Sequence, residues 1–226
     1  MSIELVCLGD THSLHKDVKV PDGDILIHVG DFSNVGNLED TKNFLDWFSS
    51  LKYQYHILIA GNHDFLPYEN STLFRALLDE YPSIIYLQDN EVKIEGVRFY
   101  GSPWTPTFND WAFMLDRGAE IKTKWNKIPE DTDVLITHGP PNGILDEVYK
   151  GGIPWHIGCE ELAKAVERIK PGLQVVGHIH DGYGFLKKEN TLIVNASICT
   201  EDYDPTNVPI IVKVKVGKDG KKIFNI

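Results

Sequence analysis

Short runs of apolar, often β-branched residues recur along the chain, and most of them are bordered by Gly, Pro or Asp. Runs of this length, bounded by turn-forming residues, predict β-strands. The predicted strands span residues 3–9, 25–29, 55–60, 84–87, 91–94, 97–101, 133–137, 173–177, 191–195 and 209–215.

Three other segments place apolar residues at helical spacing and predict helices. Residues 37–52 carry six such positions, from Leu38 to Leu51, and residues 71–82 begin with a capping Ser or Thr. Residues 158–172 end at a Pro-Gly pair. Helices alternate with strands early in the chain and strands cluster later, which predicts an α/β protein with a mixed sheet or two packed sheets.

The connection between the strands predicted at 97–101 and 133–137 is long and rich in aromatic residues. Long connections are often lids over a site, or contain a short helix. Three interpretations stay open for this segment: a wall that faces the substrate, a satellite hydrophobic cluster, or a dimer contact. Its large aromatic residues are Trp104, Phe108, Trp111, Phe113 and Trp125.

Five of the apolar runs end in side chains that bind metals or protons. In sheets with helical crossovers, ligands gather at the carboxyl ends of the strands. Imidazole, carboxylate and amide groups together suit Mn, Fe, Zn or Co, and the set is too large for one tetrahedral ion, so it suits two. The candidates are Asp10, His12, Asp31, Asn62, His63, His138, His178 and His180.

The spacing and the flanking residues agree with a metal site. In "GDTH" and "GHIH" two candidate ligands stand two residues apart, so both face the same side of an extended backbone. Glycine before four of the candidates permits close backbone approach around an ion. Strand-end Asp and His residues also cap turns and helices, but capping does not explain why four imidazoles converge with two carboxylates.

Composition limits the protein class. The chain has 226 residues, 42% of them hydrophobic and 24% charged, which is typical of a soluble globular protein. We expect a single domain over residues 1–226, because no linker, repeat or low-complexity tract interrupts it. No apolar run is long enough to span a bilayer, and the first residues do not resemble a signal peptide. A cytoplasmic location is therefore expected.

Cysteine content and net charge limit the kinds of metal site and binding partner to be expected. The three cysteines, Cys7, Cys159 and Cys199, include no CxxC pair, which predicts buried free thiols and neither a disulfide framework nor a thiolate zinc site. The formal charge of −11 argues against nucleic acid as a partner, because non-specific binding depends on Lys and Arg neutralising phosphates. A local cationic site could still bind a phosphate, and the oligomeric state is open.

The ordered set "GDTH", "GD", "GNHD", "THGPP" and "GHIH", spread over residues 9–180, resembles the five signature blocks of the calcineurin-like metallophosphoesterases. The words "GSPWTP", "THGPPNGILD", "HIGCEEL" and "GHIHDGYG" further resemble the MPPED-like subgroup, which is related to class III cyclic-nucleotide phosphodiesterases.

The resemblance implies a two-sheet mixed β-sandwich flanked by helices, a four-layer architecture with a dinuclear site along its edge. One metal would be held by Asp10, His12, Asp31 and His180, and the other by Asp31, Asn62, His138 and His178. Asp31 would then bridge the ions.

The same resemblance implies catalytic roles for His63 and Asp64. His63 would steady the phosphate and protonate the leaving oxygen, and Asp64 would fix its ring from behind, although an N-cap role for Asp64 would look the same in sequence. Asn62 and His180 would join His63 in binding substrate. Two ions about 3.5–4 Å apart can share a hydroxide of lowered pKa for in-line attack on phosphorus.

Other residues are interpreted more plainly. His28 and His56 lie inside or beside apolar runs and are expected in the core, whereas His15 faces the site from behind or lies on the surface. His156 is expected to begin a helix outside the ligand set. His156 and Trp104 are candidates for contact with substrate.

The sequence therefore predicts a dinuclear metal-dependent phosphodiesterase that acts on small diesters such as cyclic nucleotides. The site-forming blocks contain no Arg, which favours a diester over a dianionic monoester, unless Arg98 or Arg117 folds toward the metals. Two alternatives remain: a phosphomonoesterase or nuclease of the same superfamily, and a metal-bound scaffold without turnover.

Overall fold

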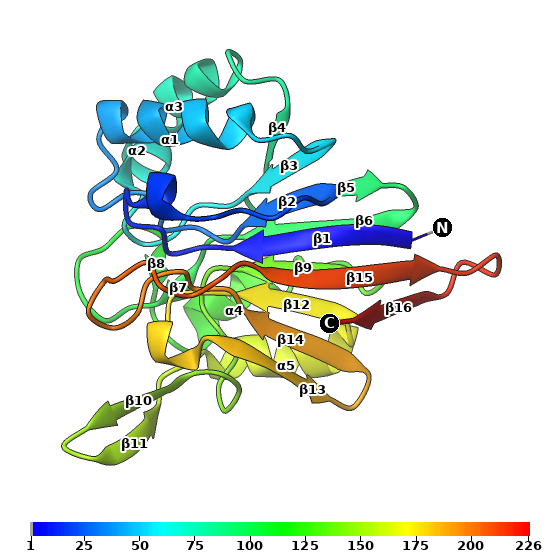
Figure 1. Ribbon diagram of the computed structural model, residues 1–226. Coiled ribbons are helices and arrows are strands. Elements are labelled where there is room, and N and C mark those ends of the chain that lie inside the picture. The colour runs from blue at the N-terminus through cyan, green and yellow to red at the C-terminus, as the bar shows by residue number, and fades with distance from the viewer. Residues whose placement is uncertain (1) are drawn as a thin grey trace.

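Two six-stranded sheets make up the centre of the computed structural model, which describes residues 2–226 (Figure 1). In the first sheet β1 to β4 run parallel, and β15 and β16 add antiparallel strands beside β1. Its strands, in spatial order, are β16 (Lys222–Asn225), β15 (Ile210–Val216), β1 (Ser2–Leu8), β2 (Ile25–His28), β3 (Tyr55–Leu58) and β4 (Ile84–Tyr86).

The second sheet has the same mixed character. Four parallel strands form its centre, and an antiparallel strand lies at each edge. Its order is β13 (Gly184–Lys188), β14 (Thr191–Asn195), β12 (Leu173–Val176), β9 (Val134–Thr137), β6 (Val97–Ser102) and β5 (Asn90–Ile94).

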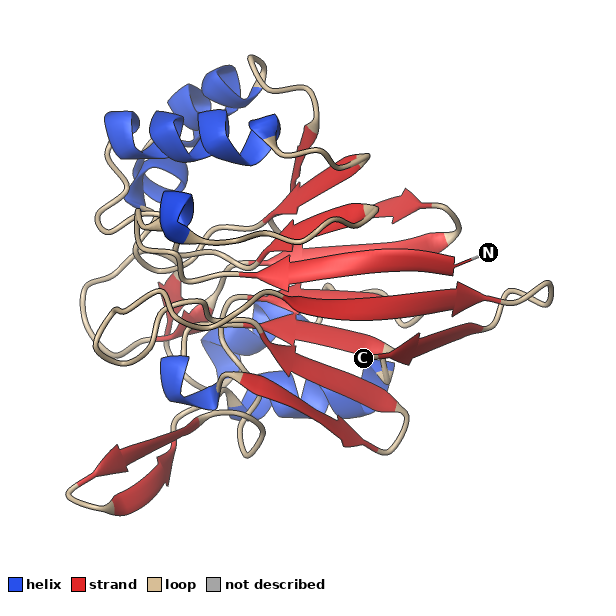
Figure 2. Cartoon of the chain, in the orientation of Figure 1, coloured by secondary structure: helices blue, strands red, loops and turns tan. Residues whose placement is uncertain are grey.

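Helices cover the outer face of each sheet (Figure 2). Those on the first sheet are α1 (Leu38–Ser50), α2 (Phe65–Glu69) and α3 (Ser71–Leu78), and those on the second are α4 (Ala119–Trp125) and α5 (Glu160–Ile169). The four layers of helix, sheet, sheet and helix confirm the predicted fold class.

Alternation along β1 explains the layers. Leu5 and Cys7 point between the sheets and pack with residues of the second sheet such as Val134. Val6 and Leu8 point to the opposite side, toward the α1 cluster. Because side chains alternate along a strand, a strand that is apolar at every position can be buried on both faces.

All ten predicted strands and all three predicted helices are present, with ends shifted by a few residues. The sequence did not indicate α2, β13 or β16, nor the strand pairs β7 (Thr105–Pro106) with β8 (Met114–Leu115) and β10 (Glu147–Lys150) with β11 (Ile153–His156), whereas α4 lies in the long connection for which a short helix was one possibility. Most of these elements are short, and strands of this length depend on their partners more than on local propensity. Two 3₁₀ turns, η1 (His15–Asp17) and η2 (His180–Gly182), complete the fold.

One predicted boundary is wrong. His156 does not begin a helix, because it is the last residue of β11, and α5 begins four residues later.

Cys159 caps α5, with its Sγ accepting from the Leu162 amide at 3.4 Å. The other two cysteines are also buried free thiols. Within residues 2–226, no helix is long and apolar enough to cross a membrane.

The topology places many strand ends along one edge. β1, β2 and β3 of the first sheet and β9, β12 and β14 of the second run with their arrowheads toward the left of Figure 1. The loops that follow these strands therefore meet at one edge of the sandwich, where a site is expected in open α/β sheets.

Candidate metal centre

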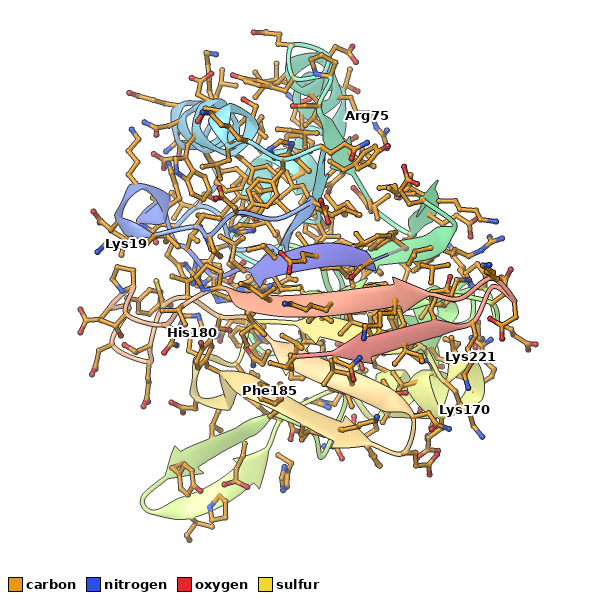
Figure 3. All side chains as sticks on the ribbon, turned by 45° about the vertical axis from the view of Figure 1, so that its right-hand side comes forward. Lys19, Arg75, Lys170, His180, Phe185 and Lys221 are labelled. Carbon is orange, nitrogen blue, oxygen red and sulfur yellow. The ribbon has the colours of Figure 1, made fainter. Side chains whose placement is uncertain are left out.

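The loops after the parallel strands bring the predicted ligands together. Asp10 follows β1, Asp31 follows β2, Asn62 follows β3, and His138 and His178 follow β9 and β12. All of these residues are buried or nearly so. Figure 3 shows His180 at this same edge, beside the loop 199–208.

The first group of side chains contains Asp10, His12 and His180, whose donor atoms all lie within 4.8 Å of one another. The Nε2 atoms of His12 and His180 are 3.2 Å apart, and His180 Nε2 is 3.6 Å from Asp10 Oδ1. Three of the four residues predicted for one ion therefore converge as expected.

The second group contains Asp31, His138 and His178, again within 4.8 Å. His138 Nε2 is 3.3 Å from Asp31 Oδ2 and 3.0 Å from the amide oxygen of Asn62. The same Asp31 Oδ2 is 3.9 Å from His12 Nε2 in the first group. Asp31 thus lies between the two groups.

Hydrogen bonds behind the site fix which nitrogen of each imidazole faces inward. His138 Nδ1 lies 2.9 Å from the Val29 carbonyl oxygen, and His180 Nδ1 lies 2.8 Å from that of Thr200. Because a carbonyl only accepts, each Nδ1 carries a proton, and each Nε2 faces the cluster. A nitrogen that faces carboxylate and amide oxygens in this way needs a cation between them, either a proton or, once the nitrogen is deprotonated, a metal ion, so these residues fit divalent metal ions.

The electrostatics agree with this requirement. Although burial raises the pKa of Asp10, its hydrogen bond and charge interaction with His180 bring it down to about 2. Burial likewise acts against ionisation of Asp31, but the charge of His138 holds the pKa of that carboxyl well below its usual range. Burial lowers the pKa of His12 to about 4 and that of His178 to about 3, so both are neutral and ready to bind a metal.

When no ion is bound, the protonated His138 compensates the negative charge of the buried carboxylates. Burial alone lowers its pKa, but the charge of Asp31 outweighs this and raises the pKa to about 9. A proton on His138 and a metal ion at the same place satisfy the same carboxylate. Metal binding should therefore displace that proton.

Backbone conformation at the site is unusual. Asp10, His12, Asp31 and His178 all have positive φ angles, between 43° and 67°. Such angles are uncommon for residues other than glycine, and they persist where the surrounding structure enforces them, as at functional sites. Four of the seven predicted ligands share this strain.

Glycines beside the ligands provide the close approach that the sequence indicated. A Cβ atom at Gly61 would lie 2.2 Å from Asp31 Oδ1, and one at Gly177 would lie 2.2 Å from Asp10 Oδ2. These distances are far below van der Waals contact. Any side chain at either position would push a carboxylate out of the site.

The geometry and the comparisons with known proteins agree. A family model described as calcineurin-like phosphoesterase matches residues 4–182. The chain belongs to the calcineurin-like phosphoesterase family. It is therefore a phosphoesterase of a family that uses divalent metal ions, and its candidate ligands lie in the two groups above and in a third that joins His12, Asp31 and His63.

Curated relatives in this family span most of the chain. Metallophosphoesterase domain-containing protein 1 of Homo sapiens is 44% identical over 229 residues, which cover 92% of this chain and 69% of that protein. UPF0046 protein K07C11.7 of Caenorhabditis elegans is 36% identical and covers 92% of this chain and 74% of its own length.

Solved structures share the fold at much lower identity. TT1561 of Thermus thermophilus superposes with a TM-score of 0.62 at 12% identity, over 100% of this chain and 99% of that one. A putative 5'-nucleotidase from Staphylococcus aureus reaches 0.62 at 13% identity, over 100% of this chain and 53% of that one. Identities this low establish the family's architecture and nothing finer.

His63 lies beside the candidate ligands at the mouth of the site. Its backbone amide donates to Asp31 Oδ1 at 2.8 Å, and its Nδ1 lies 2.8 Å from the Asn34 carbonyl oxygen. Its ring stacks on Trp111 with centroids 4.2 Å apart, and its edge meets the His12 ring at 4.8 Å. The imidazole is thus held on two sides.

Asp64 does not orient the His63 ring, so that prediction is wrong. Burial raises the pKa of the Asp64 carboxyl group to about 8, and the carboxyl oxygens accept from the Gly61 amide at 2.8 Å, from the Ser33 amide at 3.1 Å and from Ser33 Oγ at 2.7 Å. The chain turns sharply after His63, which sends the two side chains in different directions. The carbonyl of Asn34 takes the place expected for Asp64, and Asp64 makes no side-chain cap bond to α2 either.

A cleft of about 580 Å³ opens over the candidate ligands. From the aromatic segment, Phe108 and Trp111 line it, so this part of the segment is a wall of the site. Trp104 does not line the cleft: its Nε1 donates to Asp89 at 3.0 Å, and Lys124 lies 3.8 Å from its ring centre. His156 lies outside it too, paired with Asp146 at 2.8 Å.

Two further residues line the cleft: Tyr203, which the sequence did not indicate, and Arg117, whose position the sequence left open. Tyr203 lies 4.7 Å from the His12 ring and 5.4 Å from the His180 ring, on the loop that follows β14. No sequence pattern marks the position of Tyr203, because only the order of the strands shows that β14 ends at the same edge of the sheet as β12. Arg117 also lines the cleft, whereas Arg98 pairs with Glu91 and Asp131.

The remaining histidines are not among the candidate ligands. His28 and His56 are buried in the core as predicted. His15 is also buried, with Nε2 3.2 Å from Asn43 Oδ1 and its ring against Trp47, so neither of its two expected places is correct.

Replacing Asp64 by Asn should destabilise the fold and leave the His63 ring in place. The amide NH₂ would face backbone donors that now reach a carboxylate oxygen, at a cost of roughly 1–3 kcal/mol for each buried group left unpaired. Urea unfolding of metal-free protein measures the change. Tyr68→Phe, an exposed change on α2, is the control and should stay within about 0.5 kcal/mol. Unaltered stability of Asp64→Asn would contradict this role.

Proposed function

We propose that the protein is a dinuclear metal-dependent phosphodiesterase that hydrolyses small phosphodiesters, with cyclic nucleotides among them. The observation that carries the proposal is the position of Asp31 Oδ2, 3.9 Å from His12 Nε2 and 3.3 Å from His138 Nε2. A carboxylate shared by two groups of ligands is suited to bridge two ions.

The residues divide between the ions as follows. Asp10, His12, Asp31 and His180 would hold one, and Asp31, Asn62, His138 and His178 would hold the other, with Mn, Fe, Zn or Co as the metals that suit the donor set. When bound, such a pair lowers the pKa of a water molecule and polarises the phosphoryl oxygens.

His63 is the proton donor to the leaving oxygen in this proposal. Its Nδ1 is engaged by the Asn34 carbonyl, so Nε2 is the nitrogen free to hold and release a proton in the cleft. Trp111 on its face and His12 at its edge restrict the ring to one orientation. Asn62 and His180 complete the groups that would contact the phosphate.

Charge in the cleft favours a diester. A monoester dianion is best bound by additional cations, yet the acidic residues Asp181 and Glu201 line the same cleft. Arg117 donates to Glu160 Oε2 at 2.6 Å and to the Gly158 and Ile157 carbonyls at 2.7 Å each, so much of its charge and donor capacity is already used. A diester carries one negative charge fewer.

The cleft wall supports an organic group on the second ester oxygen. Phe108 is 52% exposed and lines the cleft, so it offers a ring for stacking. Stacking of a nucleobase on an aromatic side chain is worth roughly 1–3 kcal/mol. A phosphomonoesterase and a nuclease remain the alternatives, and the acidic rim argues against a nuclease.

Metal dependence tests the centre itself. We expect chelation to abolish hydrolysis of bis-p-nitrophenyl phosphate, and Mn or Co to restore it better than Ca.

Asp31→Asn should lose at least one bound ion, measured by inductively coupled plasma mass spectrometry, and about 10³-fold in kcat. Asp181→Asn, on an exposed residue of the same cleft, should keep its metal. Full activity of metal-free protein would refute the mechanism.

His63→Ala should keep its metal and lose rate according to the leaving group. A general acid contributes about 10²–10⁴-fold, and its loss is felt most by basic alcohols that must leave protonated. Methyl and p-nitrophenyl leaving groups on matched diesters measure the difference. An equal loss on both substrates, or the loss of an ion, would rule out this role.

Substrate class is tested by pairing each diester with its monoester. We expect kcat/KM to be about tenfold or more higher for bis-p-nitrophenyl phosphate than for p-nitrophenyl phosphate, because the cleft has few free cations and an aromatic wall. Cyclic nucleotides should be hydrolysed with at least one of Mn, Co, Fe or Zn. Faster monoester hydrolysis and no action on cyclic nucleotides would favour the phosphomonoesterase.

A further inference from the structure

Strands β10 and β11 form a two-stranded arm, residues 147–156, that stands away from the body of the molecule (Figure 1). The arm exposes large apolar side chains: Tyr149 at 62%, Ile153 at 63% and Trp155 at 54%. Isolated hairpins are marginally stable in water, and clustered exposed apolar groups usually mark a binding surface.

Buried polar contacts attach the base of the arm to the cleft wall. Asp146, fully buried, accepts from the Gly143 and Gly158 amides at 2.9 Å each and pairs with His156 Nδ1 at 2.8 Å. Arg117 donates to the carbonyls of Ile157 and Gly158 from the other side. The arm therefore has a defined direction relative to the cleft.

Strand register shows which face of the arm looks into the cleft. Val148 is paired directly with Trp155, so their side chains lie on the same face. Val148 lines the cleft, and so does Ile157, which follows the end of β11. The pairing with Val148 thus places Trp155 on the cleft side of the arm.

The opposite face has a different character. Glu147 is paired with His156 across the arm, and their side chains approach to 3.9 Å. Tyr149 alternates with Val148 and lies on this second face. The arm therefore has one face, with Val148 and Trp155, that adjoins the cleft, and an opposite face, with Glu147, Tyr149 and His156, that is turned away from it.

We propose that the cleft side of the arm is the distal part of the substrate site, where Trp155 stacks on a flat apolar group of the diester. This inference rests on the proposed phosphodiesterase function and specifies its substrates as elongated diesters that carry an aromatic ring or nucleobase far from the reacting phosphorus. The occupant is the substrate, because Val148 lines the cleft and is paired directly with Trp155 on the same face of the arm.

The test compares two substrates with the same leaving group. Methyl p-nitrophenyl phosphate is short, whereas 2-naphthylethyl p-nitrophenyl phosphate reaches outward with a flat ring. For Trp155→Ala we expect KM for the naphthyl diester to rise about tenfold, with kcat and the methyl diester unchanged within twofold. Trp155→Phe should recover most of the loss, and Tyr149→Ala, on the opposite face, should behave as wild type.

The outcomes separate the two proposals. If wild-type protein hydrolyses neither diester with any metal, the proposed function fails. If it hydrolyses both and Trp155→Ala changes neither KM, or raises both equally, the distal site is wrong. The same conclusion follows if Tyr149→Ala matches Trp155→Ala. Light scattering supplies the last check: conversion of a dimer to a monomer by Trp155→Ala would assign the face to a second copy of the chain.

Discussion

Two buried carboxylates, Asp10 and Asp31, impose the constraint on which the site depends. Both are buried, and each is held near imidazole nitrogens by the convergence of several loops. Burying negative charge is costly unless a cation or donors compensate it. Positive φ angles at both residues, and glycines where a Cβ would strike them, are the structural consequences of bringing these groups so close.

The layers of the sandwich position the loops that carry these two carboxylates. Apolar strands buried on both faces form a rigid frame, and only the loops beyond their carboxyl ends carry the chemistry. Direct hydrogen bonds hold these loops, such as those that the Gly61 amide and the Ser33 hydroxyl donate to Asp64. The cleft wall is attached in the same way, since the Ala112 amide donates to the Asn62 carbonyl at 3.0 Å.

Several interpretations of single residues were wrong because the chain turns within one or two residues. Asp64 follows His63 directly, yet its carboxylate faces the backbone of the neighbouring loop and leaves the imidazole to Asn34. His156 looked like the start of a helix but ends a strand that no periodic pattern marks. Trp104 and Trp111 belong to the same aromatic segment, but only Trp111 lines the cleft.

The sequence by itself determined ten of the strands, the α/β class and the set of candidate ligands, because apolar runs and the polar residues that end them are local patterns. Only the tertiary structure decided that Tyr203 and Arg117 line the cleft and that Val148 of the arm, paired with Trp155, lines it too. These facts depend on strand order and register, which bring together residues distant along the chain. No local pattern encodes the direction of a side chain that is set by a partner strand.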